Sequence, residues 1–160
     1  MMKKAVVAVV LGVVLLAVGA GLVLYTRSSS NPLPENIRKS VSFPIYYPSP
    51  APKGYSFDPA SPKASGDLLV YTFKDGSGKA PITMTFQPIP KDFNTTKVFN
   101  PKITPATAVP IGNQYNLSIG QQSKYVIVTD DGTLIFITSP AKIPGSAMHA
   151  LVTKLELIKS

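Results

Sequence analysis

The chain of 160 residues has room for one domain of roughly 120 residues beside a short appended segment. It contains no cysteine, which excludes disulfide bonds, thiol nucleophiles and cysteine-bound metals. Its formal charge of +8 comes from 16 basic and 8 acidic residues. The basic residues are scattered singly and no nucleic-acid motif accompanies them, so we expect no nucleic-acid partner.

An apolar run without any charge covers residues 5–25. As a helix rising ~1.5 Å per residue it would be about 31 Å long, close to a hydrocarbon core of roughly 30 Å. Lys3 and Lys4 precede the run and only Arg27 follows it closely, and positive charge stays in the cytoplasm. The sequence therefore predicts a cytoplasmic segment at residues 1–4, a transmembrane helix at 5–25 and an extracytoplasmic remainder. The protein is expected to be a single-pass signal anchor of the cell membrane.

A cleaved signal peptide is the alternative interpretation of this N-terminus. Residues 5–16 would form its hydrophobic region, and residues 18–20 would form a cleavage site of small side chains. The apolar run continues to Tyr25, beyond the roughly 7 to 15 residues of a usual cleavable region. We therefore favour the uncleaved anchor.

A polar segment with two prolines and no apolar period follows at residues 26–40. This composition is typical of a linker, so the folded domain is expected to span residues 41–160. The domain should open with a strand over residues 41–47. Pro44 within it cannot donate to a β-ladder, which indicates an edge position.

The start of this domain also carries a family resemblance. Residues 43–48, Phe-Pro-Ile-Tyr-Tyr-Pro, and residues 50–55, Pro-Ala-Pro-Lys-Gly-Tyr, resemble the opening of an extracytoplasmic domain. The family with this opening consists of uncharacterised bacterial single-pass membrane proteins, and its extracytoplasmic domain is small and of the α+β class. Ala51 stands where the family usually has leucine. The resemblance implies a domain of the bacterial envelope and brings no catalytic residue with it.

Two β-hairpins are predicted from alternating apolar and polar residues around glycine-containing turns. The first joins residues 68–73 to residues 82–86, and the second joins residues 125–129 to residues 133–138. A further half-buried strand is expected at residues 114–119. The glycines of the first turn lack the spacing of a phosphate-binding loop, and the aspartates of the second lack the other ligands of a calcium loop. We therefore expect turns at both places, and no metal or cofactor.

A long loop is expected over residues 88–107, which contain four prolines. Its apolar side chains should pack onto the domain, with one helical turn near Asp92, because leaving them in water is costly. If they instead stay exposed, they become a partner surface. The possible interaction surface consists of Phe93, Phe99, Tyr46 and Tyr47.

An amphipathic helix is predicted near the C-terminus, with Ser146 as its cap. Its apolar stripe consists of Met148, Leu151, Val152, Leu155 and Ile158. Leu157 falls on the opposite face, so a short strand over residues 155–158 remains an alternative.

The histidine at position 149 is the only one in the chain, and it lies beside the apolar stripe. No nucleophile-elbow motif accompanies it, so a partly exposed structural histidine is the favoured interpretation. An envelope hydrolase using His149 stays an alternative, as does a structural or assembly subunit of an envelope complex.

Together these patterns predict an α+β fold with a mostly antiparallel sheet of about five to seven strands and a C-terminal helix on one face. The expected function is non-enzymatic binding outside the cell membrane. The partner would be an envelope protein, a lipid or a wall polymer.

Overall fold

The computed structural model describes residues 32–159. The predicted transmembrane helix, the cytoplasmic segment before it and their orientation lie outside the described residues. Between residues 32 and 159, no helix is both long enough and apolar enough to cross a bilayer. The compact unit begins at Leu33.

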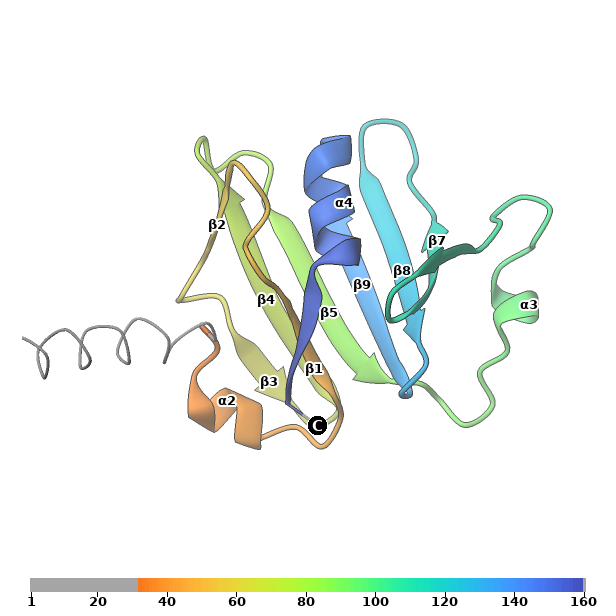
Figure 1. The fold of residues 1–160 in the computed structure, drawn as a ribbon, viewed down its shortest axis with the longest axis horizontal. Coiled ribbons are helices and arrows are strands. Elements are labelled where there is room, and N and C mark those ends of the chain that lie inside the picture. The colour runs from red at the N-terminus through yellow and green to blue at the C-terminus, as the bar shows by residue number, and fades with distance from the viewer. Residues whose placement is uncertain (1–31, 160) are drawn as a thin grey trace, which may run out of the picture. The chain divides into compact units, whose positions relative to one another are not determined.

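The described elements form an α+β fold made mostly of antiparallel strands, which confirms the predicted class (Figure 1). In chain order they are α2 (Glu35–Lys39), β1 (Ile45–Pro48), β2 (Tyr55–Phe57), β3 (Lys63–Ser65), β4 (Leu68–Asp75), β5 (Ile82–Pro88), α3 (Thr95–Val98), β6 (Thr107–Val109), β7 (Gly112–Asn116), β8 (Ser123–Thr129), β9 (Thr133–Ser139), α4 (Gly145–Thr153) and β10 (Leu155–Lys159).

The larger sheet has eight strands and the path β2-β4-β5-β9-β8-β7-β6, with β3 pairing to β4 beside β2. All its pairs are antiparallel. Both predicted hairpins are present, as β4–β5 and β8–β9, and β5 pairs with β9 to join them. The β-branched residues of the second hairpin lie in the middle of the sheet, as their composition predicts.

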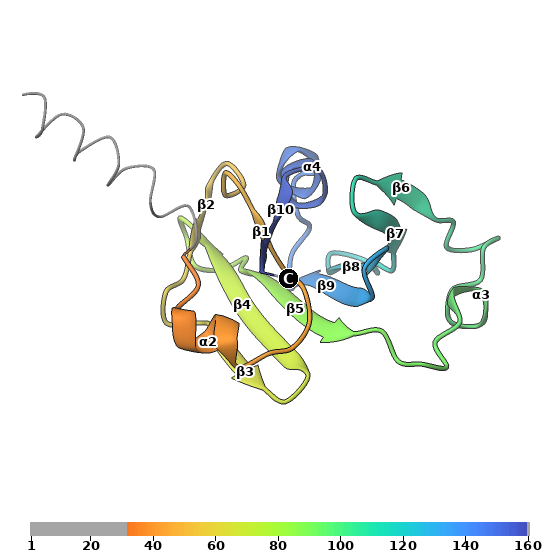
Figure 2. The same cartoon turned by 60° about the horizontal axis from the view of Figure 1, so that its bottom comes forward.

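A separate two-stranded ribbon pairs β1 with β10, so the first and last described strands are neighbours. This ribbon and α4 lie on one side of the large sheet (Figure 2). The strand expected over residues 41–47 is shorter than predicted: β1 begins at Ile45, so Pro44 lies before the strand, and β10 is the one partner of β1 within residues 32–159.

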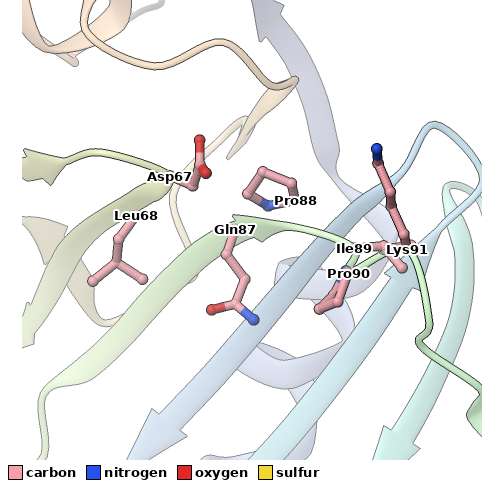
Figure 3. A pocket seen from close by; sticks show the side chains of 7 residues that line it. All are labelled: Asp67, Leu68, Gln87, Pro88, Ile89, Pro90 and Lys91. Carbon is pink, nitrogen blue, oxygen red and sulfur yellow. The ribbon is translucent and has the colours of Figure 1, made fainter.

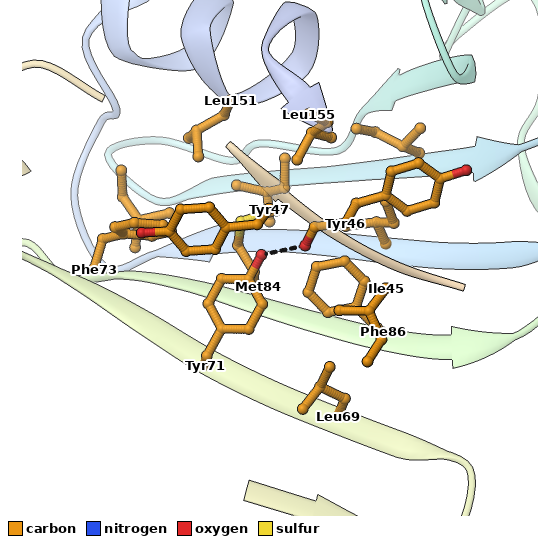
Figure 4. Packing of buried hydrophobic residues seen from close by; sticks show 14 of the residues in the cluster. Ile45, Tyr46, Tyr47, Leu69, Tyr71, Phe73, Met84, Phe86, Leu151 and Leu155 are labelled. Carbon is orange, nitrogen blue, oxygen red and sulfur yellow. Dashed lines mark hydrogen bonds between the residues drawn. The ribbon is translucent and has the colours of Figure 1, made fainter. Parts of the chain in front are cut away.

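The main core lies between the large sheet and the ribbon with α4 (Figure 4). Alternation along the strands turns Leu69, Tyr71 and Phe73 of β4 inward, and all three are fully buried. The Tyr71 hydroxyl donates a hydrogen bond of 2.7 Å to the backbone oxygen of Tyr46, which ties the sheet to the ribbon. Burial raises the pKa of Tyr71 well above its ordinary value.

A second, smaller core lies on the opposite face and covers only part of it. It contains Phe99, Tyr115, Val126 and Leu134. The rings of Phe99 and Tyr115 stack with centroids 4.1 Å apart and planes at 19°. Phe99 follows α3, a single turn capped by the side chain of Asn94. The predicted loop therefore packs onto the sheet around one helical turn, although that turn begins three residues after Asp92.

The structure differs from the sequence expectations at both ends of the domain. The segment expected to be a linker contains α2 within residues 33–40, where Leu33 is buried and Ile37 packs against the main core. Two apolar side chains four residues apart suffice for such a contact, but they are too few for a recognisable period. At the other end α4 stops at Thr153, and Leu155 begins β10, so the alternative of a short strand is confirmed.

Candidate functional site

The four aromatic residues expected to offer an interaction surface lie in the two cores. Tyr46, Tyr47 and Phe99 are only 7%, 6% and 5% exposed, and Phe93 is half-buried beside Phe99. Tyr46 and Tyr47 belong to the main core, whereas Phe93 and Phe99 belong to the smaller one. These side chains therefore do not form one exposed surface, because each ring is covered by its own neighbours.

The side chains considered for acid–base or metal chemistry are His149 and the adjacent Asp130 and Asp131. His149 is exposed on α4. The carboxylate of Asp131 accepts hydrogen bonds from the hydroxyls of Tyr46 and Thr129, which gives it a structural role in the β8–β9 turn. Among residues 32–159, no three side chains of the metal-binding types lie close enough together to hold an ion.

The part of the sheet that neither core covers forms what we call the open strip. It contains the side chains that alternate away from the main core on four neighbouring strands. They are Val70 and Thr72 of β4, Thr83, Thr85 and Gln87 of β5, Thr138 of β9, and Lys124 of β8. Phe136 of β9 faces the same way but packs against the smaller core. All members of the open strip are half-buried except Lys124, which is exposed.

Strand register arranges the open strip in rows across the strands. One row is polar and runs Thr72, Thr83, Thr138, Lys124. The next row runs Val70, Thr85, Phe136, Val126, and it passes from the open strip into the smaller core, which contains Val126 and packs against Phe136. Directly opposed residues of an antiparallel pair share one face of the sheet, so each row is a line of neighbouring side chains.

Several polar groups of the open strip are available for a ligand. The hydroxyls of Thr72 and Thr83 lie 3.4 Å apart and form a hydrogen bond. The side chains of Thr85, Gln87 and Thr138 make no hydrogen bond to any group within residues 32–159. Because these side chains are half-buried, they are positioned by the sheet and still reached by solvent.

A polar hollow of about 280 Å³ lies at one end of the open strip. It is lined by Thr83, Gln122, Ser123, Lys124, Thr138, Ser139 and Pro140. Two of these hydroxyls already serve the fold, because Ser123 accepts from the backbone of Ile143 and Ser139 accepts from that of Ala141. The remaining donors are those of the polar row and of Gln122.

A larger hollow of about 570 Å³ lies at the other end, where β5 leaves the sheet (Figure 3). It is lined by Asp67, Leu68, Gln87, Pro88, Ile89, Pro90 and Lys91. Figure 3 shows Leu68 and Gln87 extending toward the same side, whereas the amino group of Lys91 extends away from them. Gln87 is thus the polar group that connects this hollow to the open strip.

Charged side chains of both signs lie at the ends of the open strip: Lys124 ends its polar row, and Asp67 and Lys91 line the larger hollow. Segment 89–129, which forms the loop, α3 and strands β6 to β8, carries four lysines and one aspartate, and Asp130 and Asp131 follow it directly. The two ion pairs found within residues 32–159 join Lys39 to Glu35 and Lys74 to Asp58, so neither neutralises this segment. The pKa of Asp58 is lowered, chiefly by its hydrogen bond to Lys74.

The sequence predicts the members of the open strip that lie along β5, but it does not predict the members on the neighbouring strands. The alternation of β5 predicts a wet face that carries Thr83 and Thr85. The opposition of Thr72, Thr138 and Lys124 depends on strand order and register, which this single sequence does not specify.

The comparisons with known proteins identify no relative. The chain matches no protein-family model, no curated protein and no solved structure.

Proposed function

We propose that this protein is a membrane-tethered, extracytoplasmic binding domain of the bacterial envelope, with no enzymatic activity, and that the open strip is its binding surface. The observation that carries the proposal is the open strip itself. One part of the sheet face is covered by an ordered loop, while the neighbouring part presents hydroxyl and amide groups between two hollows.

The predicted anchor would hold this surface close to the membrane. Only residues 26–32 separate the apolar run from Leu33, and they reach at most about 25 Å when fully extended. A domain held this closely meets ligands at the membrane surface or in the adjoining envelope layer. Tethering also raises the local concentration of the domain at its ligand.

The position of the domain can be tested by cysteine labelling, because the chain has no cysteine of its own. Single variants Ser30→Cys and Gln121→Cys are treated in intact cells with a membrane-impermeant thiol reagent. Gln121 is exposed in the turn between β7 and β8. We expect both sites to be labelled on full-length protein in the membrane fraction. Protection of both sites, or labelling of a shortened soluble product, would contradict the tethered topology.

The binding surface can be tested by photo-crosslinking from within the envelope. A photoreactive residue at position 85 lies in the open strip, and one at position 149 lies on the exposed side of α4. We expect a discrete adduct from position 85 and none from position 149. Equal adducts from both positions would show that the open strip is not the binding surface.

A further inference from the structure

We infer that a second surface of the domain, formed around Ile103 and Ile119, docks onto an anionic lipid bilayer. We call these two side chains and the hollow between them the isoleucine tip. The tip shares only Lys124 with the open strip, so it adds a membrane contact to the proposed binding function. Four properties support the inference: exposure, fixed position, charge and the length of the tether, of which the last rests on the proposed anchor.

The isoleucine tip presents the two most exposed large apolar side chains found within residues 32–159. Ile103 is 77% exposed and Ile119 is 81% exposed. They come from the loop after α3 and from the turn between β7 and β8, yet both line one hollow of about 460 Å³. A single exposed isoleucine is common on a protein surface, but two that meet at one place indicate a contact surface.

Both isoleucines are held in position by hydrogen-bonded turns. The N–H of Ile119 donates to the backbone oxygen of Gln122 at 3.2 Å, and the N–H of Gln122 donates back to Ile119 at 3.1 Å. The N–H of Ile103 donates to the backbone oxygen of Asn100 at 2.9 Å, and Asn100 follows the buried Phe99. Small and polar residues usually occupy turns, so folding alone does not require isoleucine at either place.

The hollow of the tip contains a lysine and no acidic residue. It is lined by Ile103, Thr104, Asn116, Leu117, Ser118, Ile119 and Lys124. Lys124 is exposed, and a second exposed lysine, Lys102, directly precedes Ile103. Apolar side chains beside lysine match the boundary of an anionic bilayer, where acyl chains lie beneath negatively charged head groups.

The aspartates nearest to the tip in sequence lie toward the other end of the sheet. Asp130 is six residues after Lys124 along β8, about 20 Å, and the next aspartate follows it into the β8–β9 turn. Figure 1 shows this turn and the β7–β8 turn at opposite ends of the sheet. Asp92 comes three residues after Ile89, whose N–H donates to the backbone oxygen of Gly132 in the same distant turn. The charge of Lys124 is therefore not neutralised by these carboxylates.

The proposed tether would keep the isoleucine tip within reach of the bilayer. Residues 26–32 reach at most about 25 Å before Leu33. The helix α2 then lies beside β3 at one edge of the large sheet, whereas the tip lies at the edge formed by β6 and β7 (Figures 1 and 2). A domain tethered near one edge can lean onto the bilayer with the other, and the tether makes lipid the partner at the highest local concentration.

The test uses the full-length chain in vesicles, with a single tryptophan as the probe. The chain has no tryptophan of its own, so Ile119→Trp reports from the tip alone. The vesicles contain equal parts of phosphatidylglycerol and phosphatidylcholine, with brominated acyl chains that quench tryptophan on contact. Leu157→Trp is the matched control, because Leu157 is 52% exposed on the ribbon, which lies on the other side of the large sheet. We expect a loss of emission and a shift to shorter wavelength for Ile119→Trp and neither for Leu157→Trp.

A charge variant tests the preference for anionic lipid. Adding Lys124→Gln to the Ile119→Trp chain should lower the ratio of docked to undocked domain about fivefold, since one lysine near an anionic surface contributes about that factor. Vesicles of phosphatidylcholine alone should likewise reduce the quenching. Lys154→Gln, an exposed lysine after α4, is the matched control and should leave the quenching unchanged.

Three outcomes would overturn the inference. They are no bromolipid quenching of Ile119→Trp, equal quenching of Ile119→Trp and Leu157→Trp, and quenching that depends on neither phosphatidylglycerol nor Lys124. A protein adduct from a photoreactive residue at position 119, without quenching by lipid, would assign the tip to a protein instead. Thermal unfolding checks the fold of each variant, and Ile103→Trp repeats the measurement from the other side of the hollow if Ile119→Trp fails to fold.

Flotation of the same vesicles after an alkaline wash tests the proposed anchor separately. A chain that floats with the vesicles but shows no quenching retains the anchor and refutes docking by the tip. Quenching in a chain that the wash removes from the vesicles supports docking by the tip and contradicts the anchor.

Discussion

The hydroxyl of Tyr46 donates a hydrogen bond to the carboxylate of Asp131, which lies 85 residues further along the chain. This bond joins the ribbon strand β1 to the turn between β8 and β9. The hydroxyl of Thr129 lies 2.5 Å from the other carboxylate oxygen and accepts from the backbone of Thr133. The turn and the ribbon are therefore held by one carboxylate.

Replacing Tyr46 with phenylalanine should destabilise the domain by about 1 to 2 kcal/mol, because the bond to a charged carboxylate is lost while the ring remains. Urea unfolding monitored by circular dichroism measures the change. Tyr125→Phe is the matched control, since this tyrosine is half-buried and makes no side-chain hydrogen bond within residues 32–159; it should change stability by less than about 0.5 kcal/mol. If Tyr46→Phe and Tyr125→Phe lower the free energy of unfolding equally, the hydrogen bond between Tyr46 and Asp131 does not stabilise the domain.

Alkaline solution should weaken the fold through its buried tyrosines. Burial raises the pKa of Tyr47 from 10.0 to about 12, so the folded state holds the phenolic proton more tightly than the unfolded state does. Its contribution to stability is complete below pH 10 and is lost as the pH rises through about 12. Urea titrations across this interval should show a falling free energy of unfolding and a smaller fall in Tyr47→Phe. If the free energy of unfolding falls as steeply with pH in Tyr47→Phe as in the parent, Tyr47 is not the source of the alkaline loss of stability.

Gly112 should not tolerate a side chain. Its φ is +147°, and a Cβ there would lie 2.1 Å from the backbone oxygen of Val128 in the neighbouring strand. We expect Gly112→Ala to cost at least about 2 kcal/mol, measured by thermal unfolding. Gly145→Ala at the start of α4 is the control, because its Cβ would meet nothing within 4 Å. A Gly112→Ala variant as stable as this control would disprove the close approach of β7 and β8.

The loop that covers part of the large sheet is held in place mainly by the side chain of Phe99. Phe99 is 5% exposed and stacks on Tyr115, so Phe99→Ala should cost about 3 kcal/mol and loosen the loop. Hydrogen exchange of the loop amides reports the second effect. Ile103→Ala in the same loop is the control, since Ile103 is 77% exposed and its loss should change stability by less than about 0.5 kcal/mol. Comparable effects from the two changes would show that the loop is not anchored by Phe99.

Local patterns predict the hairpins, the packed loop and the presence of a C-terminal helix correctly, because each depends on residues close together in sequence. The helix bounds are wrong: α4 begins at Gly145 without a cap from Ser146, and it ends at Thr153 before Leu155 and Ile158 of the predicted stripe. The alternation of Ile82, Met84 and Phe86 identifies the buried face of β5 without knowledge of any other strand. The misfit of Leu157 to the helical stripe also indicates the strand at the C-terminus, where this side chain is 52% exposed.

The remaining features depend on contacts between distant residues. No local pattern indicates that Tyr46 meets Asp131, or that the first strand of the domain pairs with the last. The aromatic residues of the opening strand look suited to a partner surface from sequence, but they fill the core because the ribbon lies across the sheet. The open strip becomes visible only when the order of β4, β5, β9 and β8 is known.

The pairing of β1 with β10 also constrains when the protein can fold. Synthesis delivers β1 early, but its partner strand Leu155–Lys159 emerges more than a hundred residues later. Until then the large sheet lacks the layer formed by the ribbon and α4, and the rings of Tyr71 and Phe73 stay uncovered. If the domain crosses a membrane during synthesis, it must cross as an unfolded chain and close its core on the far side.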